Sequence, residues 1–392
     1  MRPVVSHRHR QPDGAAAERR TVRATSRARR QAAGQAWFDA IQSFGLLVII
    51  VTGSVVLGLA TPVFFTAANL ENVLYSATVI AVVAIGETFV ILVAGIDLSV
   101  SAVLALSSVL SVGLVVNQGL PPAMGIVAAL LAGAIIGVAN GLACTKLRIT
   151  ALIVTLASLS IARGLAFIYS GGENIAPVPH FFVFAQNAKV LGFPVIILFT
   201  LLLALLAHLG LTRTRFGRSV YATGGNALAA RLSGIRTDRV VLGCYAISGI
   251  TAAIGGLMIT ARLEAGAATS GEGMELTVIA AVVIGGTSLF GGEGSIGGML
   301  LGVLLLGLVQ NAVDLLNVPP NYDSVVSGFV IAGAAALDVY RRYYVEASLR
   351  RRTGTGKQAS PSASNSRALE SSEQASVLPD SLHDQATGGM SK

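Results

Sequence analysis

Charged side chains are scarce in this chain of 392 residues. Only 12% of the residues are Asp, Glu, Lys or Arg, whereas 53% are hydrophobic. A soluble globular domain usually has about 25% charged residues. Between positions 40 and 211 the charged residues are eight in number: Glu71, Glu87, Asp97, Lys146, Arg148, Arg163, Glu173 and Lys189. This composition excludes an ordinary soluble domain and indicates that lipid is the solvent for most of the chain.

The sequence also lacks the short patterns that mark common catalytic and metal sites. It contains no H-E-x-x-H motif, no zinc-type pair of cysteines and no nucleophile elbow. The two cysteines, Cys144 and Cys244, lie inside apolar runs without metal-ligand spacing, so we expect both to be packing residues. We therefore expect no catalytic residue, no metal and no cofactor bound by this chain itself.

Two glycine-containing patterns are similar to nucleotide-binding motifs but lack their context. Residues Gly292–Gly297 fit G-x-G-x-x-G, yet they lie between apolar runs rather than in a βαβ unit. Gly356 and Lys357 end a phosphate-loop pattern whose first position is occupied by Arg351 instead of Gly. The chain therefore carries no ATP-binding motif.

Long apolar runs predict ten transmembrane helices, and therefore an all-α integral membrane protein. A helix needs about 20 residues to cross the hydrocarbon layer, where it satisfies its own backbone hydrogen bonds. The predicted spans are Phe38–Ala60, Val73–Ala94, Ser99–Val116, Ala123–Thr145, Ala151–Tyr169, Val190–Leu209, Val240–Ala261, Leu276–Phe290, Ile296–Leu316 and Ser324–Tyr340. The bundle occupies residues 36–345, between a disordered basic tail at 1–35 and a disordered tail at 346–392. A transit peptide is the alternative for the first tail.

Positive charges orient the predicted bundle. With the N-terminus inside, the inner loops between spans carry Lys146, Arg148, Arg213, Arg215, Arg218, Arg231, Arg236 and Arg239, whereas the outer loops carry Lys189 and Arg262. This bias follows the positive-inside rule. An even number of spans also places Arg341, Arg342 and Arg350–Arg352 on the inside. We therefore expect a multi-pass plasma-membrane protein with both termini in the cytoplasm.

The basic loop at residues 213–239 contains a predicted surface helix. Asn226 is a favourable N-cap, and Gly234 is a natural stop. Leu228 and Leu232, four residues apart, form a small apolar face that suits a groove on a partner protein. The alternative is an ordinary surface helix that caps the bundle.

Three ionisable residues lie in or at the edges of the predicted spans. Asp97 interrupts an apolar stretch, where it is either a functional group or, together with Ser99, an ordinary cap of the next helix. Glu87 and Arg163 lie deeper. They either pair with each other, line a hydrated path or extend to the membrane interface.

Short motifs follow one another in a fixed order along residues 38–345. They are Gly95-Ile96-Asp97-Leu98-Ser99-Val100, Ala139-Asn140-Gly141-Leu142, Thr155-Leu156-Ala157-Ser158, Arg163-Gly164, Gly224-Gly225-Asn226-Ala227, Ala230-Arg231-Leu232-Ser233-Gly234-Ile235, Gly285-Gly286-Thr287-Ser288-Leu289 and Gly291-Gly292 with Gly294-Ser295. In these motifs the chain resembles the ribose-type permeases of bacterial ABC importers, although Ser101 replaces the Gly that the family usually carries.

The resemblance implies a permease subunit that translocates a monosaccharide, together with several partners. It implies a cytoplasmic ABC ATPase that binds the ATP, an extracytoplasmic sugar-binding protein that docks on loops 171–191 and 262–275, and a second permease, identical or related. It implies no nucleic acid. Coupling to the ATPase then falls to Gly225, Asn226, Leu228, Ala229, Ala230, Arg231, Leu232 and Gly234.

A sugar offers hydroxyl groups, so neutral polar residues suit its path. Asn140, Thr155, Ser158 and Asn311 lie in apolar spans and join Glu87, Asp97, Ser99 and Arg163 as candidate path residues. Interhelical hydrogen bonds are the alternative role of the four neutral residues. The sequence does not name the sugar, because specificity in such importers is largely set by the binding protein.

Three other functions remain as alternatives: a branched-chain amino-acid permease of the related ABC family, an ion-coupled secondary transporter, and a membrane scaffold without transport. Ion-coupled carriers often place several ionisable groups at mid-membrane, and such groups are sparse here. A weak internal echo between residues 84–88 and 283–287 is typical of the repeats found in many transporters.

Overall fold

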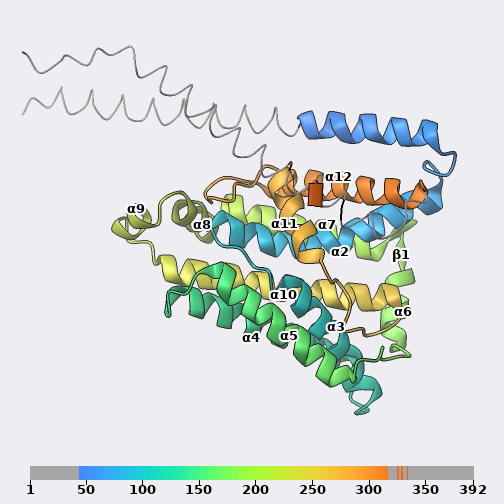
Figure 1. Ribbon diagram of the computed structural model, residues 1–392, viewed down its shortest axis with the longest axis horizontal. Helices are drawn as coiled ribbons and strands as arrows, with labels where there is room; N and C mark the ends of the chain where they lie inside the picture. Colours follow the sequence, from blue (N-terminus) through green and yellow to red (C-terminus); the bar gives the residue numbers. More distant parts are fainter. Residues whose placement is uncertain (1–43, 317–324, 326–327, 330–332, 334–392) are drawn as a thin grey trace, which may run out of the picture. The chain divides into compact units, whose positions relative to one another are not determined.

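The computed structural model describes residues 44–316 and, beyond them, positions 325, 328, 329 and 333 (Figure 1). Both predicted tails, most of the last predicted span and the first residues of the first span lie outside these residues.

The described part of the chain is built from helices and one very short ribbon. After a helix at Phe44–Ala60 come α2 (Ala67–Leu92), α3 (Val100–Val116), α4 (Pro122–Thr145), α5 (Ala151–Ser170), α6 (His180–Asn187), β1 (Lys189–Val190), β2 (Phe193–Pro194), α7 (Val195–Arg213), α8 (Arg215–Gly225), α9 (Ala227–Leu232), α10 (Thr237–Leu263), α11 (Met274–Ile284) and α12 (Ile296–Leu315). The two strands pair antiparallel, with Val190 opposite Phe193. The prediction of an all-helical membrane protein is confirmed.

Six helices in the described residues are long and apolar enough to cross a membrane: α2, α4, α5, α7, α10 and α12. Each coincides with a predicted span. Three further apolar helices are shorter: Phe44–Ala60, α3 and α11. Six candidate spans are therefore established, and ten remains the expected total.

Two predicted boundaries are wrong for identifiable reasons. The span predicted to begin at Val190 begins at Val195, because residues 189–194 form the β1–β2 ribbon. The span predicted to end at Phe290 ends at Ile284, because a glycine-rich turn follows it. In that turn Gly286, Gly291 and Gly292 have φ angles of 95°, 82° and 78°, a region of the backbone map that favours glycine.

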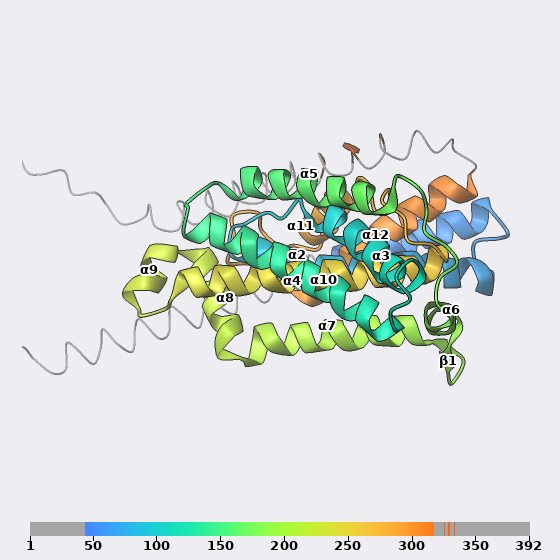
Figure 2. The ribbon, with the colours of Figure 1, turned by 90° about the horizontal axis from the view of Figure 1, so that it is seen from below.

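Helix α3 lies at the centre of the bundle, and most of its residues are buried. It packs against α4, α5 and α10, while α10 also packs against α2. In Figure 2, α5 and α7 lie on opposite sides of the bundle, with α3 and α10 between them. Exposed leucine, isoleucine and phenylalanine side chains cover much of α5 and α7, as expected for helices that face lipid.

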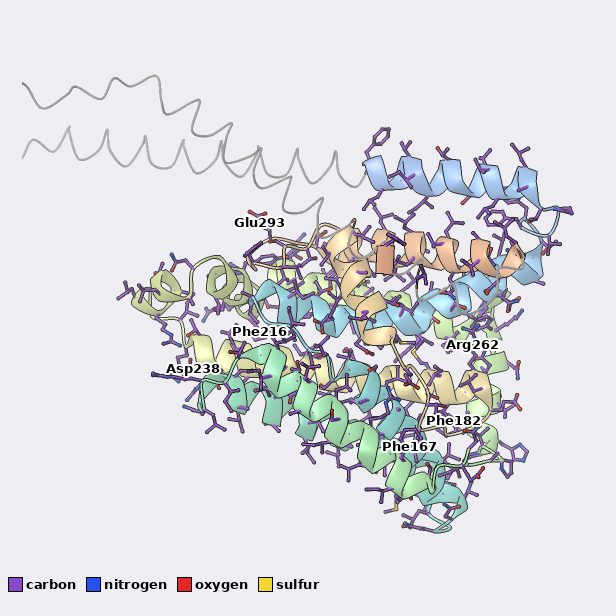
Figure 3. The ribbon with its side chains drawn as sticks, viewed as in Figure 1. Phe167, Phe182, Phe216, Asp238, Arg262 and Glu293 are labelled. Atoms are coloured by element: carbon purple, nitrogen blue, oxygen red, sulfur yellow. The ribbon has the colours of Figure 1, made fainter. Side chains whose placement is uncertain are left out.

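Two short connections interrupt the inner part of this bundle. The first break, residues 93–99, joins α2 to α3, and the second break, residues 285–295, joins α11 to α12. The α8–α9 segment (Arg215–Leu232) lies at one end of the bundle, whereas α6 and β1 lie at the opposite end (Figure 1). Figure 3 shows Phe216, Asp238 and Glu293 toward the first end and Arg262 and Phe182 toward the other.

Glycines bring α4 and α10 into direct backbone contact. A Cβ added to Gly249 would overlap the carbonyl oxygen of Gly133, and a Cβ added to Gly137 would overlap that of Tyr245. Small residues allow such approach in lipid, where no hydrophobic effect drives helices together. Close helix packing is therefore the role of these glycines, whereas Gly297 has open space around its Cβ position.

We expect Gly249→Ala to destabilise the protein by about 1–3 kcal/mol, the usual cost of overpacking. Gly210→Ala in α7 is the matched control, because a Cβ there meets nothing within 4 Å. That control should be neutral or stabilise by about 0.5–1 kcal/mol, since Ala is the better helix former. The melting temperatures of the purified variants in detergent measure both effects. Equal melting temperatures for the two variants would contradict the contact.

Candidate functional site

The first break carries a buried acid, Asp97, whose carboxylate is held by three donors. The side chain is 1% exposed. Its Oδ1 accepts from the Ser99 amide at 3.0 Å and from the Ser99 hydroxyl at 2.5 Å, and its Oδ2 accepts from the Ser248 hydroxyl of α10 at 2.8 Å. The bond from the Ser99 amide is a turn of the chain just before α3, and the N-cap residue of α3, Ser99, makes no side-chain cap bond. The bond to Ser248 adds a tie between the break and another helix.

The hydrogen bonds continue from Ser99 into two more helices. Asn140 of α4 donates through Nδ2 to the Ser99 hydroxyl oxygen at 3.0 Å, and Ser158 of α5 donates to the Asn140 carbonyl oxygen at 2.5 Å. One chain of polar contacts thus links α10, the first break, α4 and α5. We call Glu87, Asp97, Ser99, Asn140, Ser158 and Ser248 the Asp97 network.

Glu87 of α2 is the second acid of this network and is fully buried. Its Oε1 accepts from the backbone amide of Asp97 at 3.1 Å, and its Oε2 has no hydrogen-bond partner among the described residues. Across residues 44–316, no Lys, Arg or His lies within ion-pair distance of either acid. A buried carboxyl group without a counter-charge is costly; hydroxyl and amide donors compensate both oxygens of Asp97 but only Oε1 of Glu87.

Thr155 of α5 lies beside the same break. Its hydroxyl donates to the carbonyl oxygen of Ala151 at 2.9 Å and faces that of Ile96 at 3.4 Å. The Tyr245 hydroxyl of α10 donates to the same Ile96 oxygen at 3.3 Å. The structure therefore brings together six of the eight candidate path residues: Glu87, Asp97, Ser99, Asn140, Thr155 and Ser158.

Arg163, the seventh candidate, lies apart from this cluster. Its guanidinium Nη1 donates to the carbonyl oxygens of Ala268 and Ser270, at 2.6 and 3.0 Å, in the segment between α10 and α11. The predicted alternative of a pair between Arg163 and Glu87 is wrong, because each group has other partners. A helical sequence does not by itself reveal which neighbour a side chain meets, and this long side chain reaches a loop rather than an acid.

Asn311, the eighth candidate, also lies apart. It exchanges two hydrogen bonds with Asn69 across α12 and α2, at 2.7 and 3.1 Å. The amide of Asn69 also donates to the carbonyl oxygen of Phe64 at 2.9 Å. This geometry favours the interhelical role for Asn311 over contact with a passing solute.

The α8–α9 segment contains the short helix that was predicted for the basic loop. Asn226 caps α9, since its Oδ1 accepts from the Ala229 amide at 2.9 Å. Gly234 ends the turn with a φ of 84°. Leu228 and Leu232 are 69% and 82% exposed, so an apolar face is indeed presented outward.

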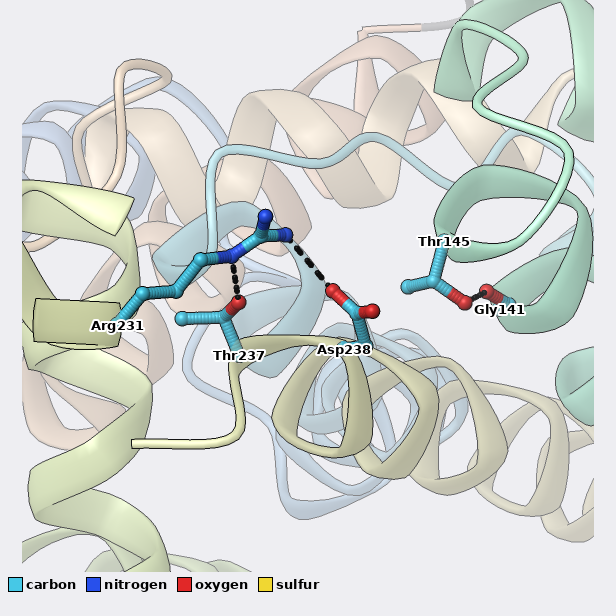
Figure 4. Close-up of polar contacts among 5 residues, drawn as sticks. All are labelled: Gly141, Thr145, Arg231, Thr237 and Asp238. Atoms are coloured by element: carbon cyan, nitrogen blue, oxygen red, sulfur yellow. Dashed lines mark hydrogen bonds and ion pairs between the residues drawn. The ribbon is translucent and has the colours of Figure 1, made fainter. Parts of the chain in front are cut away.

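Of the other residues expected to couple α9 to a partner, some are exposed and others are used in contacts within the chain. Ala229 is exposed and Ala230 is buried, so only Ala229 is free to touch another protein. Arg231 donates to the Thr237 hydroxyl at 2.7 Å and pairs with Asp238 at 2.8 Å, which ties α9 to the start of α10 (Figure 4). Gly225 joins α8 to the cap residue, and a Cβ there meets open space.

Sequence reasoning missed Ser248 and Tyr245 of α10, which complete the surroundings of the first break. The only signal was that both are polar residues inside the predicted span Val240–Ala261. No structural role was predicted for Gly224 either, because the sequence shows only that it is followed by a second glycine.

A bundle of apolar helices around a buried polar network defines a multi-pass membrane protein of the transport class. The family described as "Branched-chain amino acid transport system / permease component" matches residues 69–335. The chain therefore belongs to this permease family.

Curated relatives agree with the expected resemblance to ribose-type permeases. The ribose import permease protein RbsC of Haemophilus influenzae is 37% identical over 76% of this chain and 93% of its own length. RbsC of Bacillus subtilis is 40% identical, with coverages of 75% and 90%. The D-allose transport system permease protein AlsC of Escherichia coli K12 is 36% identical, with coverages of 77% and 92%. No solved structure matches the chain significantly.

We expect Asp97→Ala to lower the stability of the protein strongly. It removes the acceptor of the Ser99 amide and of two hydroxyls, and each buried polar group left unsatisfied costs about 1–3 kcal/mol. Asp97→Asn should lose less, since its carbonyl oxygen still accepts and the Ser248 hydroxyl can rotate to accept from the new amide.

The melting temperature of each purified variant measures this order. Asp314→Ala serves as the control, because Asp314 is exposed near the end of α12 and a surface substitution usually changes stability by no more than about 0.5 kcal/mol. A melting temperature for Asp97→Ala close to that of the control would contradict the role of the carboxylate.

Proposed function

We propose that this chain is the membrane-spanning permease subunit of an ATP-driven importer and that its cargo is a monosaccharide of the ribose type. The observation that carries this proposal is the identity of 37–40% to ribose import permeases over at least nine tenths of their length. The permease is not itself an enzyme, and the ATP is bound and hydrolysed by a separate subunit.

An amino-acid cargo is the main competing proposal, because the matching family description names branched-chain amino acids. The names of the curated relatives favour sugar instead: they are permeases for ribose, D-allose and L-arabinose. The Asp97 network offers hydroxyl and carboxamide groups, from Ser99, Asn140 and Ser158, of the kind that can hydrogen-bond a sugar.

The expected partners follow from this proposal. An ABC ATPase docks on the exposed face of α9 in the cytoplasm, and a sugar-binding protein docks on loops 171–191 and 262–275 outside. A second permease, identical or related, completes the pathway. The chain crosses the plasma membrane ten times with both termini in the cytoplasm, and the positive-inside distribution of Lys and Arg supports this orientation.

We expect transport to require ATP and to accept sugars. The full chain is reconstituted into liposomes with its partner ATPase and sugar-binding protein, and uptake of labelled D-ribose, D-allose and L-arabinose is followed. Uptake of at least one sugar should stop without ATP, survive an ionophore that collapses ion gradients, and resist an excess of leucine. Uptake that stops with the ionophore alone would establish a secondary transporter, and competition by leucine would establish an amino-acid permease.

We expect the double variant Leu228→Asp/Leu232→Asp to abolish co-purification of the ATPase. Both side chains are exposed, so the change removes an apolar contact without disturbing the core. Leu191→Asp is the matched control, because Leu191 is 94% exposed in the β1–β2 turn at the other end of the bundle. Loss of the ATPase in both variants, or in neither, would contradict docking on α9.

A further inference from the structure

The second break contacts the end of α2 and the start of the first break, mainly through backbone atoms. The amide of Gly292, in the second break, donates to the carbonyl oxygen of Leu92 at 2.9 Å. A Cβ added to Gly291 would lie 2.8 Å from the amide nitrogen of Ala94. Leu92 is the last residue of α2, the helix that carries Glu87, and the break that follows it carries Asp97. This contact therefore lies directly beside the Asp97 network.

The end of α8 fits into the same contact. A Cβ added to Gly224 would overlap the carbonyl oxygen of Leu92 and lie 2.6 Å from the amide nitrogen of Gly292. Gly224 is thus wedged between the end of α2 and the second break, with no side chain between the three backbones. Only glycine fits this position, because any Cβ would push α8 away from α2 or from the second break.

Two further contacts of α8 reach the same structures. The Tyr221 hydroxyl donates to the carbonyl oxygen of Gly294 in the second break at 2.9 Å. The ring of Phe216 stacks on that of Phe89 in α2, with ring centres 6.3 Å apart. Helix α8 is therefore attached to α2 and to the second break along its length rather than at one point.

Helix α8 is also continuous with the proposed docking helix. Only Asn226 separates α8 from α9, and its side chain caps α9. Helix α9 is also tied to the start of α10, through the hydrogen bond from Arg231 to Thr237 at 2.7 Å and the Arg231–Asp238 ion pair, whose side chains are 58% and 44% exposed. An exposed ion pair is weak and tolerates movement, whereas backbones in contact transmit displacement.

We propose that Gly224 is a positioning residue for transport: its backbone contact with Leu92 and Gly292 carries a movement of α9 to both breaks, and through the first break to the Asp97 network. This inference rests on the proposed function and specifies the route by which a nucleotide-driven movement reaches the interior. In this scheme α8 transmits the movement from the cytoplasmic surface to the two breaks.

The test is the Gly224→Ala variant in the complete complex with its ATPase and binding protein, assayed with labelled D-ribose, D-allose and L-arabinose. The readout is the number of ATP molecules hydrolysed per sugar imported. It should rise at least about tenfold, within the range typical of coupling between linked sites. Purely structural damage would instead lower hydrolysis and import together. Gly297→Ala, at the start of α12 beside the second break, is the control, because a Cβ there meets nothing within 4 Å.

A second variant keeps the test decisive if Gly224→Ala does not assemble. Tyr221→Phe deletes only the hydroxyl that donates to Gly294, so the complex should form and the ratio should rise about twofold or more, the loss of one hydrogen bond. The proposal is overturned if Gly224→Ala assembles and leaves the number of ATP molecules hydrolysed per sugar unchanged. If Gly224→Ala does not assemble, an unchanged number in Tyr221→Phe overturns it. A wild-type complex without ATP-dependent sugar import refutes the proposed function instead, and is recognised before any variant is made.

Discussion

Interrupting a helix inside an apolar bundle leaves backbone groups that water cannot reach, and each must find a partner within the protein. The first break meets this constraint group by group. The amides of Ala94 and Gly95 return to carbonyl oxygens of α2. The amide of Asp97 uses the carboxyl group of Glu87, and the carbonyl oxygen of Ile96 receives Tyr245. The acid near the end of α2 thus has a structural role, since it accepts one of the backbone hydrogen bonds of the interrupted helix pair.

The same groups that satisfy the break also define the polar interior of the protein. Asp97 accepts hydrogen bonds from Ser99 and Ser248. Ser99 in turn accepts from Asn140, which accepts from Ser158. A network that joins several helices in this way rigidifies the bundle as long as every member keeps its partner. The residues that support the interrupted helix and those that join the surrounding helices are therefore one set.

Composition carried enough information to predict the long helices and most of the polar cluster. Six long apolar runs became helices, and Asn226 became the N-cap of α9, because these features depend on residues close in the sequence. Features that depend on distant residues were not accessible. The partner of Asn311 is 242 positions away, and Arg163 meets carbonyl oxygens in a loop more than a hundred positions away. An apolar run also hides a glycine turn, which is why the end of α11 was predicted too late.

The internal echo illustrates a further limit of short patterns. Residues 84–88 lie wholly inside α2, whereas α11 ends within residues 283–287. The difference follows from the fourth position, where Glu87 continues a helix and Gly286 adopts a φ of 95°. The two similar segments therefore have different structures: residues 84–88 are helical, whereas residues 283–287 contain the end of a helix.

The contacts between α4 and α10 have a consequence for how the protein moves. Where the backbone at Gly133 meets Gly249 and that at Gly137 meets Tyr245, neither helix can slide along the other without first separating from it. The pair consequently behaves as one rigid strut. Any rearrangement of the bundle therefore has to move α4 and α10 together, whereas the leucine-rich faces of α5 and α7 are exposed.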